Sequence, residues 1–171
     1  MRRGETITLA CGSRILIRPI EPADAELIKT GFKHLSAVSR YRRFLTPIDH
    51  LSKSQIDYLT NVDHQHHEAF VALDSSGEGI GIARYVRDPE DDKQAEAAVV
   101  VIDAWQGRGV GRALAELLAV RAREAGVERL TARMLVGNHA GWRLLERVAE
   151  DITQTQDGGT IEVTARLRAR R

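Results

Sequence analysis

The sequence lacks most features that mark secreted, membrane-bound and nucleic-acid-binding proteins. Its 171 residues include one cysteine, Cys11, which excludes an internal disulfide and fits a reducing compartment. No apolar run approaches ~18 residues, the length that crosses a membrane, and the amino terminus (MRRGETITL) lacks the apolar core of a signal peptide. A net charge of +1 gives no general affinity for nucleic acid or membranes. We therefore expect a cytoplasmic protein that binds neither.

Aromatic residues are also scarce, at 5%, although the apolar share (43%) and the charged share (29%) are ordinary for a globular protein. The length suits one domain with a single substantial core. The sequence shows no internal repeat, low-complexity block or inter-domain linker. We therefore expect a single domain over residues 1–171.

The spacing of apolar residues predicts a mixture of strands and helices. Strands are expected over residues 6–9, 14–19, 69–73, 80–87, 94–102, 129–136, 151–156 and 160–167. Helices are expected over residues 23–33, 36–45, 52–60, 110–125 and 138–148. Short polar links indicate antiparallel neighbours, whereas the strand–helix–strand unit over residues 99–136 should be parallel. The predicted fold class is α/β, with a mixed, mostly antiparallel central sheet of about seven strands and helices on both faces.

The most informative segment is residues 99–112, VVVIDAWQGRGVGR. A β-branched run ends in a short turn, after which Gly107, Gly109 and Gly111 open an apolar helix. The start of a helix leaves backbone N–H groups unpaired, and the helix dipole makes that end electropositive. Glycine also lets a ligand approach the backbone closely. The segment therefore predicts a phosphate-binding loop.

Two common phosphate loops do not fit this segment. No Gly-Lys-Ser/Thr follows the glycines, as a P-loop requires, and Arg112 stands where the dinucleotide fingerprint has its third glycine. What remains is Q-x-x-G-x-G, formed by Gln106, Gly109 and Gly111 and flanked by Arg108 and Arg112. This pattern resembles the pyrophosphate loop of the GNAT superfamily of acyl-CoA N-acyltransferases. A glycine-rich turn without a ligand is the alternative.

The order of the predicted elements also matches the GNAT fold, so the resemblance covers most of the chain. It implies acetyl-CoA as the co-substrate, with the backbone of residues 100–102 paired to the pantetheine arm and the acyl carbonyl. It also implies that Asn138 contacts the cofactor, although an asparagine that caps a helix needs no functional explanation. The residues expected to bind the cofactor are Val100, Val101, Ile102, Gln106, Gly107, Arg108, Gly109, Val110, Gly111, Arg112 and Asn138.

Glu96 is the candidate catalytic base. Acyl transfer to an amine requires a group that removes a proton from the amine, and a carboxylate near the acyl group can do so directly or through water. An acidic residue is unfavourable within a buried strand unless it lines a cleft. A solvated edge position is the alternative. In GNAT enzymes that use a glutamate base, the glutamate lies on this strand, and Glu96 has the matching distance from Gln106.

The sequence departs from the GNAT pattern in the helix expected over residues 138–148. Many relatives carry a tyrosine or another proton donor there to protonate the leaving thiolate, whereas this helix contains none, and its nearest polar residues, His139 and Trp142, are poor substitutes. Water or the proton of the amine itself can take that role. Ala149-Glu150 also replaces the usual glycine and aromatic residue, so the acceptor side of the site is less well specified than the cofactor side.

Two clusters of polar residues have simpler interpretations. Residues 63–67 (DHQHH) lack the spacing of a structural zinc site and are expected to form a solvated loop, so no metal site is predicted. The basic runs at residues 40–43 (RYRR) and 166–171 (RLRARR) are expected to be solvated faces or strand ends. The first run could instead dock an acidic or protein substrate.

Residues 13–28 (SRILIRPIEPADAELI), 35–45 (LSAVSRYRRFL) and 95–114 (AEAAVVVIDAWQGRGVGRAL) resemble the bacterial protein-lysine acetyltransferase branch of the superfamily. This resemblance implies an N-acetyltransferase that moves an acetyl group from acetyl-CoA to a primary amine, preferably a protein lysine. A small-molecule amine acetyltransferase and a non-catalytic acyl-CoA-binding sensor are the alternatives. The expected partner is a protein-lysine or small-amine acceptor, and a homodimer is left open.

Overall fold

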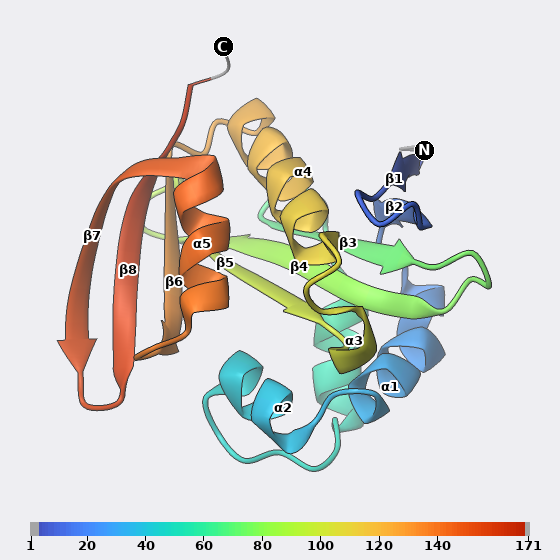
Figure 1. Cartoon of the computed structure of the whole chain (residues 1–171). Coiled ribbons are helices and arrows are strands. Elements are labelled where there is room, and N and C mark those ends of the chain that lie inside the picture. Colours follow the sequence, from blue (N-terminus) through green and yellow to red (C-terminus); the bar gives the residue numbers. More distant parts are fainter. Residues whose placement is uncertain (1–3, 170–171) are drawn as a thin grey trace.

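The central feature of the protein is one sheet of eight strands (Figure 1). The computed structural model describes residues 4–169. The strands are β1 (Glu5–Thr8), β2 (Arg14–Pro19), β3 (His67–Leu73), β4 (Gly79–Arg87), β5 (Gln94–Val101), β6 (Arg129–Leu135), β7 (Ala149–Asp157) and β8 (Thr160–Leu167). The α-helices are α1 (Ala25–Lys33), α2 (Ala37–Phe44), α3 (Lys53–Thr60), α4 (Val110–Glu124) and α5 (His139–Val148).

The strand order is β1-β2-β3-β4-β5-β6-β8-β7, and β5–β6 is the parallel pair in an otherwise antiparallel sheet. The mixed, mostly antiparallel α/β fold is thereby confirmed, with eight strands where about seven were expected. The turns after β3, β4 and β7 each join antiparallel neighbours, as their polar sequences predict. None of the helices within residues 4–169 has the length and apolar content that a membrane span requires.

Helices cover both faces of the sheet, as predicted (Figure 1). A side chain at Gly81 of β4 would meet Leu114 and Val110 of α4, at 3.0 and 3.3 Å. Its neighbour Ile82 packs instead with Ile28 of α1 in a separate apolar cluster. Because successive residues of a strand point to opposite faces, α4 and α1 lie on opposite sides of β4.

The helix α4 forms because its apolar residues recur at helical spacing. Val110, Leu114, Leu118 and Ala122 are all at most 2% exposed and face the sheet. Burying a valine or leucine side chain contributes about 1.5–3 kcal/mol. The packing of these residues against the sheet therefore stabilises α4 more than its intrinsic helix propensity does. Gly126, at φ +86°, ends the helix in a conformation that other residues adopt only at a cost.

Candidate active site

The strands β5 and β6 separate after a short parallel contact. Their register covers Gln94↔Arg129, Ala95↔Leu130 and Glu96↔Thr131, and within the described chain no pair follows. β6 continues alongside β8, and β5 continues alongside β4 as far as Val101. Residues 97–101 of β5 therefore have a strand neighbour on one edge only. Such an edge can accept an extended ligand through its backbone N–H and C=O groups.

The glycine-rich loop lies at the carboxyl end of β5. Gly107 (φ +74°) and Gly109 (φ +97°) both have left-handed backbone conformations, and Gly109 is the N-cap of α4 without a side-chain cap. A side chain at Gly107 would meet nothing within 4 Å, so its backbone conformation, not crowding, requires glycine there. The first turn of α4 thus presents uncapped N–H groups, which together with the helix dipole favour an anion.

Gln106 holds this loop against two other elements. Its Nε2 donates to the Val101 carbonyl oxygen at 3.0 Å and to Ser39 Oγ of α2 at 3.1 Å. Asp103 makes a second link, because its Oδ1 accepts the backbone N–H of Ser36 at 3.0 Å. The side chain of Gln106 therefore positions the loop relative to β5 and α2. Sequence patterns at Gln106 gave no sign of the contact with Ser39, which is 67 positions away.

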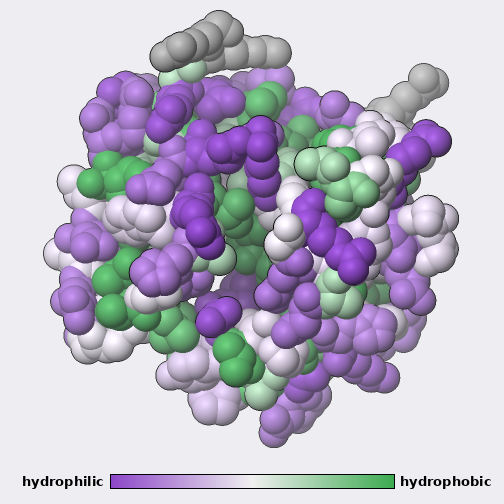
Figure 2. All heavy atoms as spheres, in the orientation of Figure 1, coloured by the Kyte–Doolittle hydropathy of each residue, from purple (hydrophilic) through white to green (hydrophobic). Residues whose placement is uncertain are grey.

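A cavity of about 350 Å³, called the large cavity below, lies between this loop, β5, α2 and the start of α5. Figure 2 shows a hollow on this face that is apolar in its depth and has hydrophilic residues at its rim. Eight of the predicted site residues line the large cavity: Val100, Val101, Gln106, Gly107, Gly109, Gly111, Arg112 and Asn138. The structure therefore brings together residues from positions 100–138 of the chain.

The other predicted residues lie outside the wall of the large cavity. Val110 is fully buried beneath Gly81, and Ile102 is 9% exposed and faces a different cavity. Arg108 places its guanidinium 5.0 Å from the centre of the Trp105 ring. For Val110 and Ile102, a role in ligand binding would rest on the main chain, because their side chains belong to the core or to another cavity.

Positive charge dominates the polar part of the large cavity. Its lining includes Arg42 and Arg43 of α2, Arg112 of α4 and Arg143 of α5, and no acidic residue. Arginine suits phosphate groups because its planar guanidinium binds two oxygens at once. Arg42, Arg43 and Arg143 were not among the predicted site residues. Their spacing in the sequence gives no sign that α2 and α5 face the same cavity.

Glu96 lies at the point where β5 and β6 separate. It is opposite Val86 of β4, while Ala98 and Val100 are opposite Arg84 and Ile82, so these alternating residues face the α1 side of the sheet. Glu96 is exposed, and its negative charge acts on the guanidinium of Arg43, where it partly opposes the lowering of the Arg43 pKa by burial. It does not line the large cavity. Its exposure leaves it accessible to an acceptor and fits both a base and a solvated edge residue.

Asn138 caps α5 as expected. Its Oδ1 accepts the backbone N–H of Gly141 at 3.0 Å, and the residue also lines the large cavity. In the same helix the indole N–H of Trp142 donates to Glu146 at 2.8 Å, and His139 is exposed. Neither Trp142 nor His139 lines the large cavity.

The basic run at residues 40–43 is only partly the solvated face that was expected. Arg40 stacks on Phe32, with 4.4 Å between its guanidinium carbon and the ring centre, and Arg43 is half-buried between cavities. The interpretation of Arg43 as a solvated charge is therefore wrong, because the side of α2 that carries Arg43 packs toward β5. Burial lowers the pKa of the Arg43 guanidinium, although Glu96 opposes this effect.

The histidine-rich segment 63–67 is organised by hydrogen bonds within itself. Asp63 Oδ1 accepts the backbone N–H groups of Gln65, His66 and His67 at 2.8–2.9 Å, and these bonds hold the pKa of Asp63 well below its usual range. Among the described residues, no group of three or more histidine, cysteine or acidic side chains is arranged to hold a metal ion.

Comparison with known proteins gives a consistent result. The family described as "Acetyltransferase (GNAT) domain" matches residues 14–149. The acetyltransferase Pat of Mycolicibacterium smegmatis is 33% identical over 143 residues, which are 83% of this chain and 43% of that protein. An acetyltransferase of Pseudomonas aeruginosa is 34% identical over 132 residues, or 75% of this chain and 70% of that protein. The chain therefore spans less than half the length of Pat.

Solved structures agree with these sequence matches. The GNAT domain of S. lividans PAT superimposes with a TM-score of 0.85 at 30% identity, over 96% of this chain and 97% of that one. A cAMP-binding acyltransferase from Mycobacterium smegmatis superimposes with a TM-score of 0.68 at 27% identity, over 97% of this chain and 48% of that one.

Proposed function

The chain belongs to the GNAT acetyltransferase family, and from this we propose that it transfers an acetyl group from acetyl-CoA to a primary amine, preferably a lysine of a protein. The observation that carries the proposal is the separation of β5 from β6 next to the glycine-rich start of α4. This arrangement offers a backbone edge for an extended arm and an electropositive helix end for a pyrophosphate. The resemblance of residues 13–28, 35–45 and 95–114 to the protein-lysine branch of the superfamily supports a protein lysine as the acceptor.

Within this proposal, each part of the donor site has a physical task. The N–H groups at the start of α4, with Arg112 beside them, hold the pyrophosphate, and the edge of β5 at Val100, Val101 and Ile102 holds the pantetheine arm. A backbone N–H of β5 donates to the carbonyl oxygen as that oxygen becomes negative. Gln106 and Asn138 keep the loop and α5 in place around the arm.

Glu96 is the proposed general base. It accepts a proton from the incoming amine, directly or through a water molecule, and the amine nitrogen then forms a bond to the carbonyl carbon as the carbon–sulfur bond breaks. The leaving thiolate takes a proton from water or from the amine, because neither Trp142 nor His139 lines the large cavity. We also propose that residues 1–171 form a single acetyltransferase domain, since one sheet runs through the described chain.

The test measures thiol release from acetyl-CoA with a panel of lysine peptides and small amines. Glu96→Gln should lower kcat by about 10²–10⁴-fold, the range for a lost acid–base group, while acetyl-CoA still binds. The matched control is Glu5→Gln, which removes an exposed carboxylate of β1. An unchanged rate for Glu96→Gln would exclude Glu96 as the base. Binding of acetyl-CoA without thiol release for any acceptor would favour a sensor module instead.

A further inference from the structure

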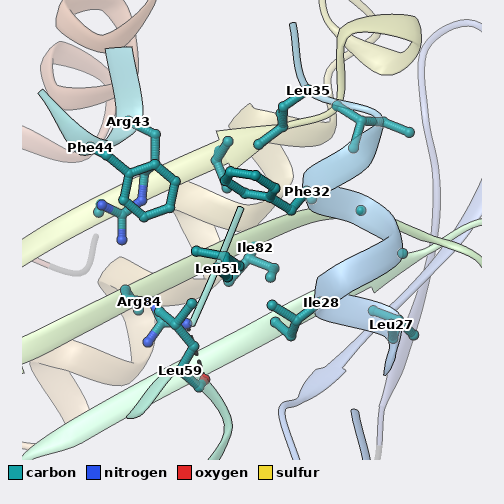
Figure 3. A pocket seen from close by; sticks show the side chains of 16 residues that line it. Leu27, Ile28, Phe32, Leu35, Arg43, Phe44, Leu51, Leu59, Ile82 and Arg84 are labelled. Atoms are coloured by element: carbon teal, nitrogen blue, oxygen red, sulfur yellow. Dashed lines mark hydrogen bonds between the residues drawn. The ribbon is translucent and has the colours of Figure 1, made fainter. Parts of the chain in front are cut away.

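A second cavity, called the apolar cavity below, lies beneath α1 on the opposite side of the sheet from α4. It has a volume of about 60 Å³ and is formed by α1, the last turn of α2, β4 and β5. Figure 3 shows that most of its wall is hydrocarbon, including Leu27, Ile28, Phe32, Leu51, Leu59 and Ile82. The proposed donor site described above does not use this cavity.

Two guanidinium groups enter the same end of the apolar cavity, away from Leu27 and Ile28 (Figure 3). Arg84 of β4 is 5% exposed and donates from Nη1 to His67 Nε2 at 2.9 Å and from Nη2 to the Leu59 carbonyl oxygen at 3.1 Å. Arg43 of α2 has a ring contact with Phe44 on its own helix. Within residues 4–169, Arg43 donates no hydrogen bond to protein atoms.

These two positive charges lie close enough to repel each other. Burial, together with the smaller effect of the charge on Arg43, lowers the pKa of Arg84 to about 10. Across the described residues, no carboxylate forms an ion pair with either guanidinium. Glu96 acts on Arg43 only from beyond ion-pair distance, and Glu96 itself is exposed. A ligand carboxylate between the two guanidinium groups would offset the free-energy cost of their burial and of their mutual repulsion.

The apolar cavity adjoins the proposed position of the acyl carbonyl. Val100 and Arg43 line both the apolar cavity and the large cavity. The proposed function puts the pantetheine arm and the acyl carbonyl along the backbone of residues 100–102, which include Val100. A chain attached to that carbonyl can therefore pass beside Val100 into the apolar cavity. A lysine ammonium is a poor occupant, because Arg43 and Arg84 would repel it.

The volume limits the length of such a chain. One water-sized group needs about 10–15 Å³ of cavity volume. The 60 Å³ of the cavity therefore hold roughly four to six non-hydrogen atoms. An acetyl group has one such atom beyond its carbonyl, whereas a succinyl group has five and a glutaryl group has six. Succinyl and glutaryl groups fit the volume and place a carboxylate at the far end.

Building on the proposed function, we propose that the apolar cavity is an acyl-chain site for short acyl groups that end in a carboxylate, such as succinyl or glutaryl, with this carboxylate between Arg43 and Arg84. The chemistry of transfer is the same as for acetyl. The carbon–sulfur bond of the thioester breaks, the amide bond forms, and the proton of the amine goes to Glu96 or to the leaving thiolate. The terminal carboxylate stays ionised and unchanged.

The first experiment compares ligands on the unaltered protein. Titration calorimetry gives the Kd of acetyl-CoA, succinyl-CoA, glutaryl-CoA and 4-methylpentanoyl-CoA, which is a neutral chain of the same shape as succinyl. Succinyl-CoA or glutaryl-CoA should bind about tenfold to a hundredfold more tightly than the neutral chain, the range for hydrogen bonds to a charged group. Tighter binding of the neutral chain would refute the carboxylate site. Tightest binding of acetyl-CoA would refute any acyl-chain role for the apolar cavity.

The second experiment removes the guanidinium groups one at a time. Arg43→Met and Arg84→Met should each reduce the preference for succinyl-CoA over acetyl-CoA by about tenfold or more. The matched control is Arg14→Met, which removes an exposed arginine of β2 and should keep the preference. An unchanged preference in Arg43→Met refutes the proposal even if Arg84→Met does not fold. Failure of every CoA ester to bind the unaltered protein would instead overturn the proposed function.

Discussion

Gly111 separates the requirements of folding from those of the donor site. It lies in the first turn of α4, and a methyl group there would be 3.5 Å from Leu144 and 3.6 Å from Val101, which are ordinary contacts. Replacing a helical glycine with alanine stabilises by about 0.5–1 kcal/mol, so Gly111→Ala should raise the Tm by roughly 1–4 °C in a domain of this size. Leu144 and Val101 both line the large cavity, so the same methyl group takes up space there.

The cost to binding follows from this loss of space. Overfilling a well-packed site costs about 1–3 kcal/mol, which corresponds to a Kd for acetyl-CoA that is roughly fivefold to 150-fold weaker. Thermal unfolding and titration calorimetry on the same sample measure both effects. Gly126→Ala is the control: at φ +86° and at the far end of α4, it should destabilise by about 1–2 kcal/mol without changing the Kd. A lower Tm for Gly111→Ala would show that the added methyl group is strained in the folded protein, and an unchanged Kd would show that it takes up no space that acetyl-CoA needs.

Two further predictions concern stability. Leu114 is fully buried between α4 and the sheet, next to Gly81. Leu114→Ala should therefore lower the free energy of unfolding by about 2–5 kcal/mol, as measured by urea titration. A loss below about 1 kcal/mol would show that the packing of Leu114 against Gly81 matters little. Burial and the charge of Arg84 lower the pKa of His67 from 6.5 to about 4. Because the unfolded chain binds more protons in that window, the free energy of unfolding should fall as the pH drops from 6.5 to about 4. His67→Gln should remove this part of the pH dependence, and an identical pH profile would contradict it.

The helices, the strands and the glycine-rich loop could be predicted from the sequence, because each of them depends on patterns over a few neighbouring residues. The apolar spacing of α4, the cap at Asn138 and the polar turns between strands all act over a few residues. The predicted parallel pairing of β5 with β6 is confirmed, but no sequence signal marked its end after Glu96. That end depends on how the two strands diverge around α4 and α5.

The role of Arg43 was beyond sequence reasoning for a different reason. A run of arginines is normally solvated, so the composition of residues 40–43 predicts exposed side chains. The spacing of Arg40 and Arg43 places both on the side of α2 that faces the protein, but this weaker signal does not overrule the prediction from composition. Arg43 lines both the large cavity and the apolar cavity, and the walls of the two cavities include residues of α1, α2, β4, β5 and α5. Only the tertiary fold brings those segments together, so a single sequence cannot show which charge is enclosed.

The brief contact between β5 and β6 also has a mechanical consequence. The sheet consists of a five-stranded part and a three-stranded part that share three residue pairs, with α4 and α5 across the junction. Within each part, every strand pairs with its neighbour over four or more residues, so the three pairs at the junction are the shortest pairing among the described strands. A molecule extended along the free edge of β5 would brace this junction. Donor binding should then slow the exchange of amide hydrogens in β6–β8, and this rate would report whether the donor is bound.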